Sequence, residues 1–182
     1  MIMDGGDQAS SQQDERYVRA AAVLSPALER LARAYEANVD QQKDLLQDIH
    51  FAVWRSFAKF DGRCSEATWV YRVAHNVASS HVASRKRRRP AAMLTLDELE
   101  LRPDPAQPDP ETETGERQAI ARLMALVRAL AVPDRQVVLL YLEGLDAAAI
   151  GEVCGLTSGA VAVKIHRLKA LLAHQFQKGG VR

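Results

Sequence analysis

Apolar residues recur at steps of three and four in the first half of the chain, which is the spacing of helices that bury one face. The first such run predicts a helix over residues 24–38, with Ser25-Pro26 in its first turn. A second run predicts another helix from Asp40 onward. Its apolar positions are Leu45, Leu46, Ile49, Val53, Trp54 and Phe57.

A third helix is predicted over residues 66–85. It follows a break in the apolar spacing at Asp61-Gly62, a pair that marks a turn, and it ends in a basic run before Pro90, which cannot continue a helix. Residues 1–22 carry little apolar surface to offset the entropy of ordering, so we predict a disordered tail. The first folded unit is then expected over residues 23–90.

Prolines and acidic residues replace the helical spacing between the two halves. Four prolines stand among Asp and Glu side chains there: Pro103, Pro105, Pro108 and Pro110. This composition is typical of a flexible, extended chain. We therefore predict an acidic, proline-rich linker over residues 91–115, a second folded unit over 116–178 and a short tail over 179–182.

The second unit opens with two predicted helices. One covers residues 116–130, and the other covers 133–142, with Pro133 in its first turn and Gly144 as its C-cap. Hydrophobic residues make up 47% of the chain and aromatic residues only 5%, a composition that favours helix packing over sheets. The predicted fold class is all-α, with two small helical domains joined by the linker.

The next segment has the pattern of a helix-turn-helix. Ile150 and Val153 face inward on a short helix, Gly155 stands at the turn, and a second helix begins beyond Thr157. The second helix leaves four side chains to reach DNA: Lys164, His166, Arg167 and Lys169. A helical hairpin with solvated basic residues remains the alternative. The motif alone also leaves repressor, activator and sigma factor undecided.

The distribution of charge and the two cysteines further limit the class of protein to which this chain can belong. The net charge of +1 averages an acidic linker with a basic run at residues 85–89, which favours contact with phosphates. Cys64 and Cys154 have no partner at disulfide or metal spacing, so we expect a reduced, cytoplasmic chain without metal or cofactor. No paired carboxylates and no nucleophile with a base are recognisable, so no enzyme activity is expected.

An ordered series of segments carries a family resemblance. Four segments resemble region 2 of extracytoplasmic-function (ECF) sigma factors of the sigma-70 family: residues 44–48, 52–55, 60–63 and 68–76. Residues 133–141 and the helix-turn-helix resemble region 4 of the same family. The resemblance implies a factor that binds core RNA polymerase, recognises the minus-thirty-five and minus-ten promoter elements and promotes DNA melting for transcription initiation.

The resemblance implies a polymerase-binding face on the second predicted helix. In the family, this helix docks on the clamp of the β′-type subunit of core polymerase. The implied partner is the core enzyme, with its β′-type and β-type subunits. The matching residues are Asp44, Gln47, Asp48, Trp54 and Arg55. A solvated face is the alternative for the charged residues, and a core position is the alternative for Trp54. An anti-sigma factor is a further implied partner.

The resemblance also places minus-ten recognition on the following loop and helix, where an unstacked base of the opened strand is captured. The implied pocket residues are Phe60, Asp61, Gly62, Arg63 and Asn76, and Tyr71 and Arg72 are surface candidates. Trp69 has two alternative interpretations, a position in the core and a role in promoter melting. Phosphate contacts are expected from Arg85, Lys86, Arg87 and Arg88.

Minus-thirty-five recognition is expected at the start of the last helix. The candidates are Thr157, Ser158, Ala160, Lys164, His166, Arg167 and Lys169. The chain departs from the family pattern at Ala162 and Val163, where sigma factors usually present basic or polar side chains. We therefore expect a weaker or altered upstream contact.

Two other classes of protein compete with this interpretation. A repressor or activator would bind duplex DNA tightly without polymerase. A helical adaptor, or a decoy that resembles a sigma factor, would bind polymerase without opening promoters. Binding to core polymerase and specific transcription distinguish the three.

Overall fold

The computed structural model describes residues 5–88, 95–96 and 115–177. The regular elements among these residues are helices, which confirms the all-α fold class. The chain divides into two compact units, residues 1–90 and 91–182. No single helix among the described residues is long and apolar enough to cross a membrane, and the pair α7 and α8 reaches that composition only when both helices are counted together.

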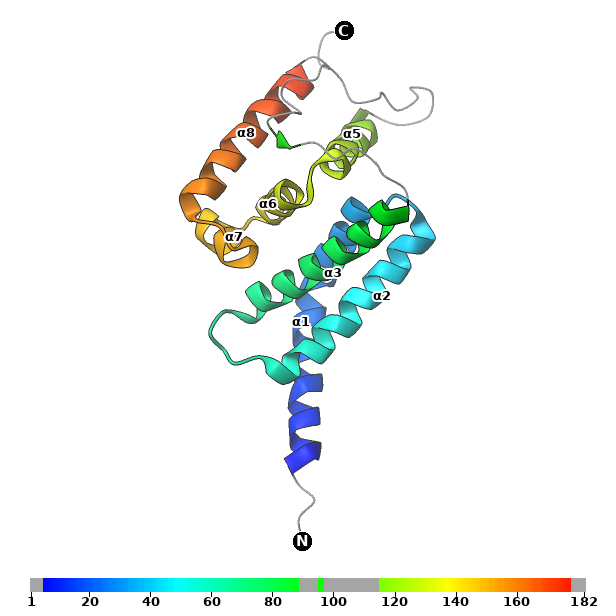
Figure 1. Ribbon diagram of the computed structural model, residues 1–182, viewed down its shortest axis with the longest axis vertical. Helices are drawn as coiled ribbons and strands as arrows, with labels where there is room; N and C mark the ends of the chain where they lie inside the picture. The colour runs from blue at the N-terminus through cyan, green and yellow to red at the C-terminus, as the bar shows by residue number, and fades with distance from the viewer. Residues whose placement is uncertain (1–4, 89–94, 97–114, 178–182) are drawn as a thin grey trace. The chain divides into compact units, whose positions relative to one another are not determined.

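The first unit is a bundle of three long helices (Figure 1). They are α1 (Gly5–Tyr35), α2 (Val39–Ser56) and α3 (Glu66–Arg88), and the short 3₁₀ helix η1 (Phe57–Lys59) follows α2. All three contribute fully buried side chains to one core, among them Leu28, Leu31, Leu45, Ile49, Val53, Val70, Ala74 and Ala78. The predicted apolar spacing of the second helix is thus confirmed at its central positions.

The prediction of a disordered tail over residues 1–22 is wrong for the part that the structure describes. α1 begins at Gly5 and continues through Pro26, so the predicted helix start at residue 24 is also wrong. Ser25 does not cap a helix there, since its hydroxyl donates to the carbonyl oxygen of Ala21 inside α1 at 2.7 Å. Residues 13–19 of α1 contact α2 and α3 through polar side chains, which an apolar pattern does not reveal.

The turn between α1 and α2 is closed by a buried carboxylate. Glu36 is 2% exposed, and its Oε1 accepts the backbone N–H of Asn38 at 2.9 Å. Its Oε2 lies 3.1 Å from Nε2 of His81 on α3. The Asn38 side chain in turn accepts two N–H groups in the first turn of α2, as an N-cap residue does. The turn therefore joins all three helices.

The second unit consists of four helices in the described residues: α5 (Gly115–Ala129), α6 (Val132–Leu142), α7 (Ala147–Cys154) and α8 (Ser158–Gln177). α6 carries proline in its first turn, and Gly144 adopts a φ of +84° just beyond its end, as predicted. Arg135, buried at the start of α6, donates through Nη2 to the carbonyl oxygens of Arg128 and Leu130, which closes the end of α5.

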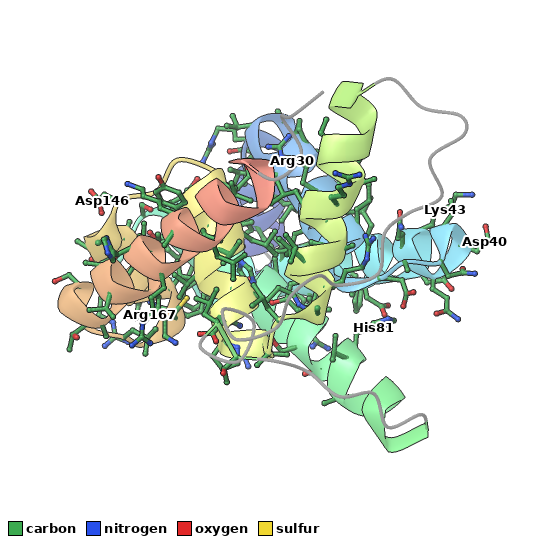
Figure 2. The ribbon with its side chains drawn as sticks, turned by 90° about the horizontal axis from the view of Figure 1, so that it is seen from above. Arg30, Asp40, Lys43, His81, Asp146 and Arg167 are labelled. Atoms are coloured by element: carbon green, nitrogen blue, oxygen red, sulfur yellow. The ribbon has the colours of Figure 1, made fainter. Side chains whose placement is uncertain are left out.

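α7 and α8 form the predicted helix-turn-helix (Figure 1). Asp146 caps α7 by accepting the N–H of Ala149, and Gly155 ends α7 with a φ of +70°. The two helices are bent by 109°, within the range of about 90–120° that this motif shows. Figure 2 shows Asp146 at α7 and Arg167 along α8. The buried positions on the two helices include Ile150, Val153, Val161 and Leu168.

Most of the predicted linker lies outside the described residues. Leu96 is an exception: it is 2% exposed, and its backbone N–H donates to Oδ2 of Asp134 on α6 at 2.9 Å. Part of the segment between the two units is thus anchored on the second unit. The flexible, extended character predicted for residues 97–114 stays a prediction.

Gly151 sets how closely the turn of the helix-turn-helix approaches α7. Its carbonyl oxygen accepts N–H groups from Gly155 at 2.9 Å and Leu156 at 3.1 Å. A Cβ atom at position 151 would lie 2.6 Å from the carbonyl oxygen of Leu156, which is backbone and cannot swing away.

We predict that Gly151→Ala lowers the stability of the second unit by about 1–3 kcal/mol, because the turn must shift to admit the methyl group. Amide hydrogen exchange in α7 and α8 measures the change. Gly159→Ala is the control, since nothing lies within 4 Å of a Cβ there. It should leave exchange unchanged or slower, because alanine is the better helix former. Equal protection in the two variants would contradict the steric explanation.

His75 is a buried titratable group in the first unit. It is 2% exposed, and its Nδ1 lies 3.2 Å from the hydroxyl oxygen of Tyr35 on α1. Burial lowers the pKa of His75 from 6.5 to about 3. The imidazole is therefore neutral in the folded protein at pH values where the unfolded chain binds a proton.

Because the unfolded state takes up this proton first, we predict that acidification from pH 6.5 toward 3 destabilises the first unit, by up to about 1.4 kcal/mol per pH unit from this group. Denaturant unfolding followed by tryptophan fluorescence tests this, since both tryptophans, Trp54 and Trp69, lie in the first unit. His75→Gln should show a flatter dependence between pH 6.5 and 5. Parallel curves for the two proteins would rule out the effect.

Candidate nucleic-acid and partner interfaces

One face of α2 presents four of the predicted polymerase-binding residues to solvent. Asp44, Gln47, Asp48 and Arg55 are exposed and follow one another at helical spacing. Figure 2 shows Asp40 and Lys43 beside one another at the start of α2, where their side chains form an ion pair at 3.4 Å.

Phe51 lies on the same face, although it was not among the predicted site residues. Its side chain is 59% exposed, and the guanidinium of Arg55 lies 5.7 Å from the ring centroid. The available signal was its position three residues after Asp48 and four before Arg55. We name the surface formed by Asp44, Gln47, Asp48, Phe51 and Arg55 the α2 face.

Trp54 lies at the edge of the α2 face, with its ring centroid 5.9 Å from that of Phe51. It is half-buried, and its indole N–H donates to Oδ1 of Asp14 on α1 at 2.7 Å. Its own carbonyl oxygen accepts the side-chain amide of Gln13 at 2.9 Å. Trp54 thus holds α1 against α2 without being part of the buried core, and its contact with polymerase stays a prediction.

The loop that contains the predicted minus-ten pocket is shaped by Asp61, Gly62 and Arg63. Gly62 has a φ of +75°, a conformation that side chains rarely adopt. Asp61 accepts the backbone N–H of Arg63 at 3.2 Å and its Nε at 2.5 Å. The hydrogen bond from the backbone N–H of Arg63 lowers the pKa of Asp61 most, and the bond from the Arg63 side chain lowers it further. The carboxylate therefore stays ionised and bound to Arg63.

Phe60 is half-buried and surrounded by rings. Trp69 lies 5.4 Å away and Phe57 6.0 Å away between ring centroids, both in edge arrangements. The Trp69 indole N–H donates to the hydroxyl of Ser56 at 2.8 Å, so Trp69 is held partly inside the bundle. The guanidinium of Arg16 lies 5.2 Å from the centroid of Phe60 and was not anticipated from the sequence.

The candidates on α3 divide between surface and core. Asn76 is exposed and lies two turns beyond Trp69 on the same side of the helix, with the half-buried Arg72 between them. Tyr71, predicted at the surface, is only 7% exposed, because it points into the bundle with Val70 and Ala74; that prediction is wrong. Arg85, Lys86, Arg87 and Arg88 form the end of α3, and their side chains lie outside the described residues.

The exposed side of α8 carries most of the predicted minus-thirty-five residues. Thr157, Ser158, Ala160, His166 and Lys169 are exposed, and Arg167 is half-buried. The hydroxyl of Thr157 accepts the N–H of Ala160 at 3.2 Å, which caps the helix. Lys169 lies over the ring of Tyr141, 5.5 Å from its centroid.

The sequence predicted that Lys164 is free to reach DNA, but the structure shows it held by another side chain. Its ammonium forms an ion pair with Oδ1 of Asp134, whose side chain is 5% exposed. Asp134 thus joins α8 to α6 and, through its other oxygen, holds Leu96. Asp134 was not among the predicted site residues, although it lies in the segment that resembles region 4. Ala162 and Val163 are exposed instead, Val163 at 52%.

Family models match both units. The model for Sigma-70 region 2 matches residues 22–88, and the model for Sigma-70, region 4 matches residues 120–172. The chain belongs to the sigma-70 family. Its relatives among curated proteins include ECF sigma factors, so the ECF type expected from the sequence is confirmed.

Two curated proteins and two solved structures are similar to this chain. The sigma factor CnrH of Cupriavidus metallidurans is 26% identical, with 91% of this chain and 89% of that protein covered. The ECF sigma factor SigE of Mycolicibacterium smegmatis is 31% identical over 89% of this chain and 61% of its own length. Among solved structures, CnrH in complex with the cytosolic domain of CnrY has a TM-score of 0.64 at 21% identity, covering 94% of each chain. The sigma factor RpoE of Bartonella quintana, solved with the anti-sigma factor NepR, has a TM-score of 0.64 at 16% identity, covering 88% and 96%.

We predict that Lys164→Met destabilises the second unit by about 1–3 kcal/mol, because it leaves the Asp134 carboxylate buried without its counter-charge. Asp134→Asn should also destabilise, through the same ion pair. The double variant should lose less than the sum of the two single losses. Hydrogen exchange in α6 and α8 measures all three. Additive losses would show that the two side chains do not depend on each other.

Proposed function

We propose that this sigma factor binds core RNA polymerase through the α2 face, captures the opened minus-ten strand near Phe60 and Asn76, and places α8 in the major groove at the minus-thirty-five element. The observation that carries the proposal is the presence of an exposed, partly aromatic α2 face and an exposed recognition helix on two separate units of one chain. The chain itself performs no chemistry; the polymerase catalyses RNA synthesis.

The α2 face suits a protein partner. It places an exposed aromatic ring among charged side chains, and exposed aromatic residues next to arginine are enriched at the energetic centres of protein interfaces. Its acidic residues, Asp44 and Asp48, disfavour DNA as the occupant of this surface. A β′-type polymerase subunit is the partner that the family supplies.

The exposed side of α8 suits duplex DNA. Thr157 and Ser158 at the start of the helix, and His166 further along it, can offer hydrogen bonds to base edges, and Lys169 can neutralise a phosphate. Lys164 is withdrawn from the proposed DNA contacts, because its ion pair with Asp134 turns it toward α6. We assign the basic end of α3 to phosphate contacts, as the run of five cations at residues 85–89 favours.

Regulation by an anti-sigma factor follows from the relatives. The solved RpoE structure contains the anti-sigma factor NepR. A partner of this type would act on the present chain by covering the α2 face or the exposed side of α8. We place the protein in the cytoplasm, where core polymerase is available.

The test is transcription by the purified chain with core polymerase on a pool of promoter fragments, scoring specific run-off transcripts and binding to core. We predict that Phe51→Ala weakens binding to core by about tenfold, since truncating an aromatic anchor typically costs 1–2 kcal/mol or more. Val39→Ala is the matched control: Val39 is 62% exposed on α2 but lies on the opposite side. A chain that binds core without yielding specific transcripts would be a decoy, and tight operator binding without core would indicate an ordinary repressor or activator.

A further inference from the structure

Residues 13–19 of α1 contact α2 and the start of α3, and Arg16 among them reaches Phe60 of the predicted minus-ten pocket. These residues precede the part of the chain that matches the region 2 family model. The match begins at residue 22, whereas α1 begins at Gly5. We call residues 13–19 the N-terminal segment. Figure 1 shows α1 extending past the other helices of the first unit toward the N-terminus.

Three side-chain contacts fix the position of the N-terminal segment. Gln13 donates to the carbonyl oxygen of Trp54 at 2.9 Å, and Asp14 accepts the Trp54 indole N–H at 2.7 Å. The hydroxyl of Tyr17 lies 3.1 Å from Nδ1 of His50. These contacts attach one side of the helix to α2 over more than one turn. The backbone of the segment is therefore held in place beside the loop that follows α2.

Arg16 extends from this fixed backbone over Phe60. Its guanidinium carbon lies 5.2 Å from the ring centroid, and its Nη1 lies 3.8 Å from Oε1 of Glu66 at the start of α3. Arg19 reaches the same carboxylate oxygen at 3.7 Å but makes no ring contact with Phe60 among the described interactions. The side chain of Arg16 is 27% exposed, whereas that of Arg19 is 62% exposed.

We propose that Arg16 is part of the minus-ten pocket: it covers Phe60 in the free protein and stacks on the unpaired base that Phe60 receives from the opened strand. The inference rests on the proposed function. It adds to the pocket a residue from outside the family's region 2, and with it a contact to single-stranded DNA made by α1.

The geometry allows the Arg16 guanidinium to move away from Phe60 and then stack on a base that enters between them. A base between ring and guanidinium requires two layers of about 3.5 Å each, so the guanidinium must retreat by roughly 2 Å from its present position. Only the side chain has to move, because the N-terminal segment is held through other residues. The ion pair with Glu66 opposes this movement weakly, since partly exposed pairs contribute about 0–1 kcal/mol.

The chemistry of arginine favours contact with the strand over simple obstruction. The guanidinium plane stacks on bases as well as on aromatic rings, and its charge attracts the phosphates of a single strand. A side chain that only blocked the pocket would need no positive charge near DNA. Arg16 therefore offers the captured base a second stacking surface opposite Phe60.

The test measures binding of a labelled oligonucleotide, the non-template strand of a promoter identified in the transcription assay, to the full chain in complex with core polymerase. We predict that Arg16→Ala weakens this binding at least fivefold, in the range expected for loss of a stacking partner. Arg16→Lys, which keeps the charge and loses the plane, should recover less than half of the lost affinity on a logarithmic scale.

Arg19→Ala is the matched control, because it removes the same charge beside the same carboxylate and should change binding less than twofold.

Asn76→Ala reports on the pocket itself. If wild-type protein binds the strand and Asn76→Ala weakens binding while Arg16→Ala does not, the inference about Arg16 is wrong and the proposed function stands. Tighter binding by Arg16→Ala would show obstruction instead, and failure of the wild-type complex to bind any strand would overturn the proposed function. Tryptophan fluorescence confirms that each variant is folded.

Discussion

The orientation of the recognition helix depends on one buried carboxylate. Asp134 lies at the start of α6, and its two oxygens bind the Lys164 ammonium of α8 and the backbone N–H of Leu96. An ionised carboxylate in this position must be compensated, because desolvation without a partner costs several kcal/mol. This ion pair therefore holds α8 against α6 together with the buried Val161 and Leu168, and the second oxygen of Asp134 anchors Leu96 on the second unit.

The first unit follows the same principle with different residues. The buried Glu36 binds Asn38 and His81, and Tyr35 meets the buried His75, so polar contacts bring α1, α2 and α3 together at one end of the bundle. At the other end, Gln13 and Asp14 bind Trp54. With few aromatic residues in the chain, directional contacts of this kind fix which faces of the helices remain exposed.

The sequence was sufficient for the fold class and for the helix-turn-helix, because apolar spacing and turn residues such as Gly144 and Gly155 are local signals. It failed at residues 5–22, where the helix is stabilised by polar contacts with α2 and α3 that only the folded structure brings together. Tyr71 and Lys164 were misplaced because residue type favoured the surface, whereas Tyr71 is buried in the first unit and Lys164 pairs with Asp134 on α6. Phe51 and Arg16 were missed because exposure and ring contact depend on tertiary structure.

The distribution of polar side chains assigns different tasks to the two proposed DNA contacts. On the exposed side of α8, Ala162 and Val163 offer no hydrogen bonds, and Lys164 is turned toward Asp134. The upstream contact is left with a few hydroxyls, His166 and Lys169, which suits positioning on the duplex more than fine discrimination between bases. Around Phe60, by contrast, aromatic rings and a guanidinium come from α1, η1 and α3, and the exposed Asn76 lies two turns further along α3. Stacking surfaces and amides are the groups that recognise an unstacked base. In the proposed function, promoter selectivity therefore resides mainly at the minus-ten pocket, and a helix that precedes the region 2 match contributes to it.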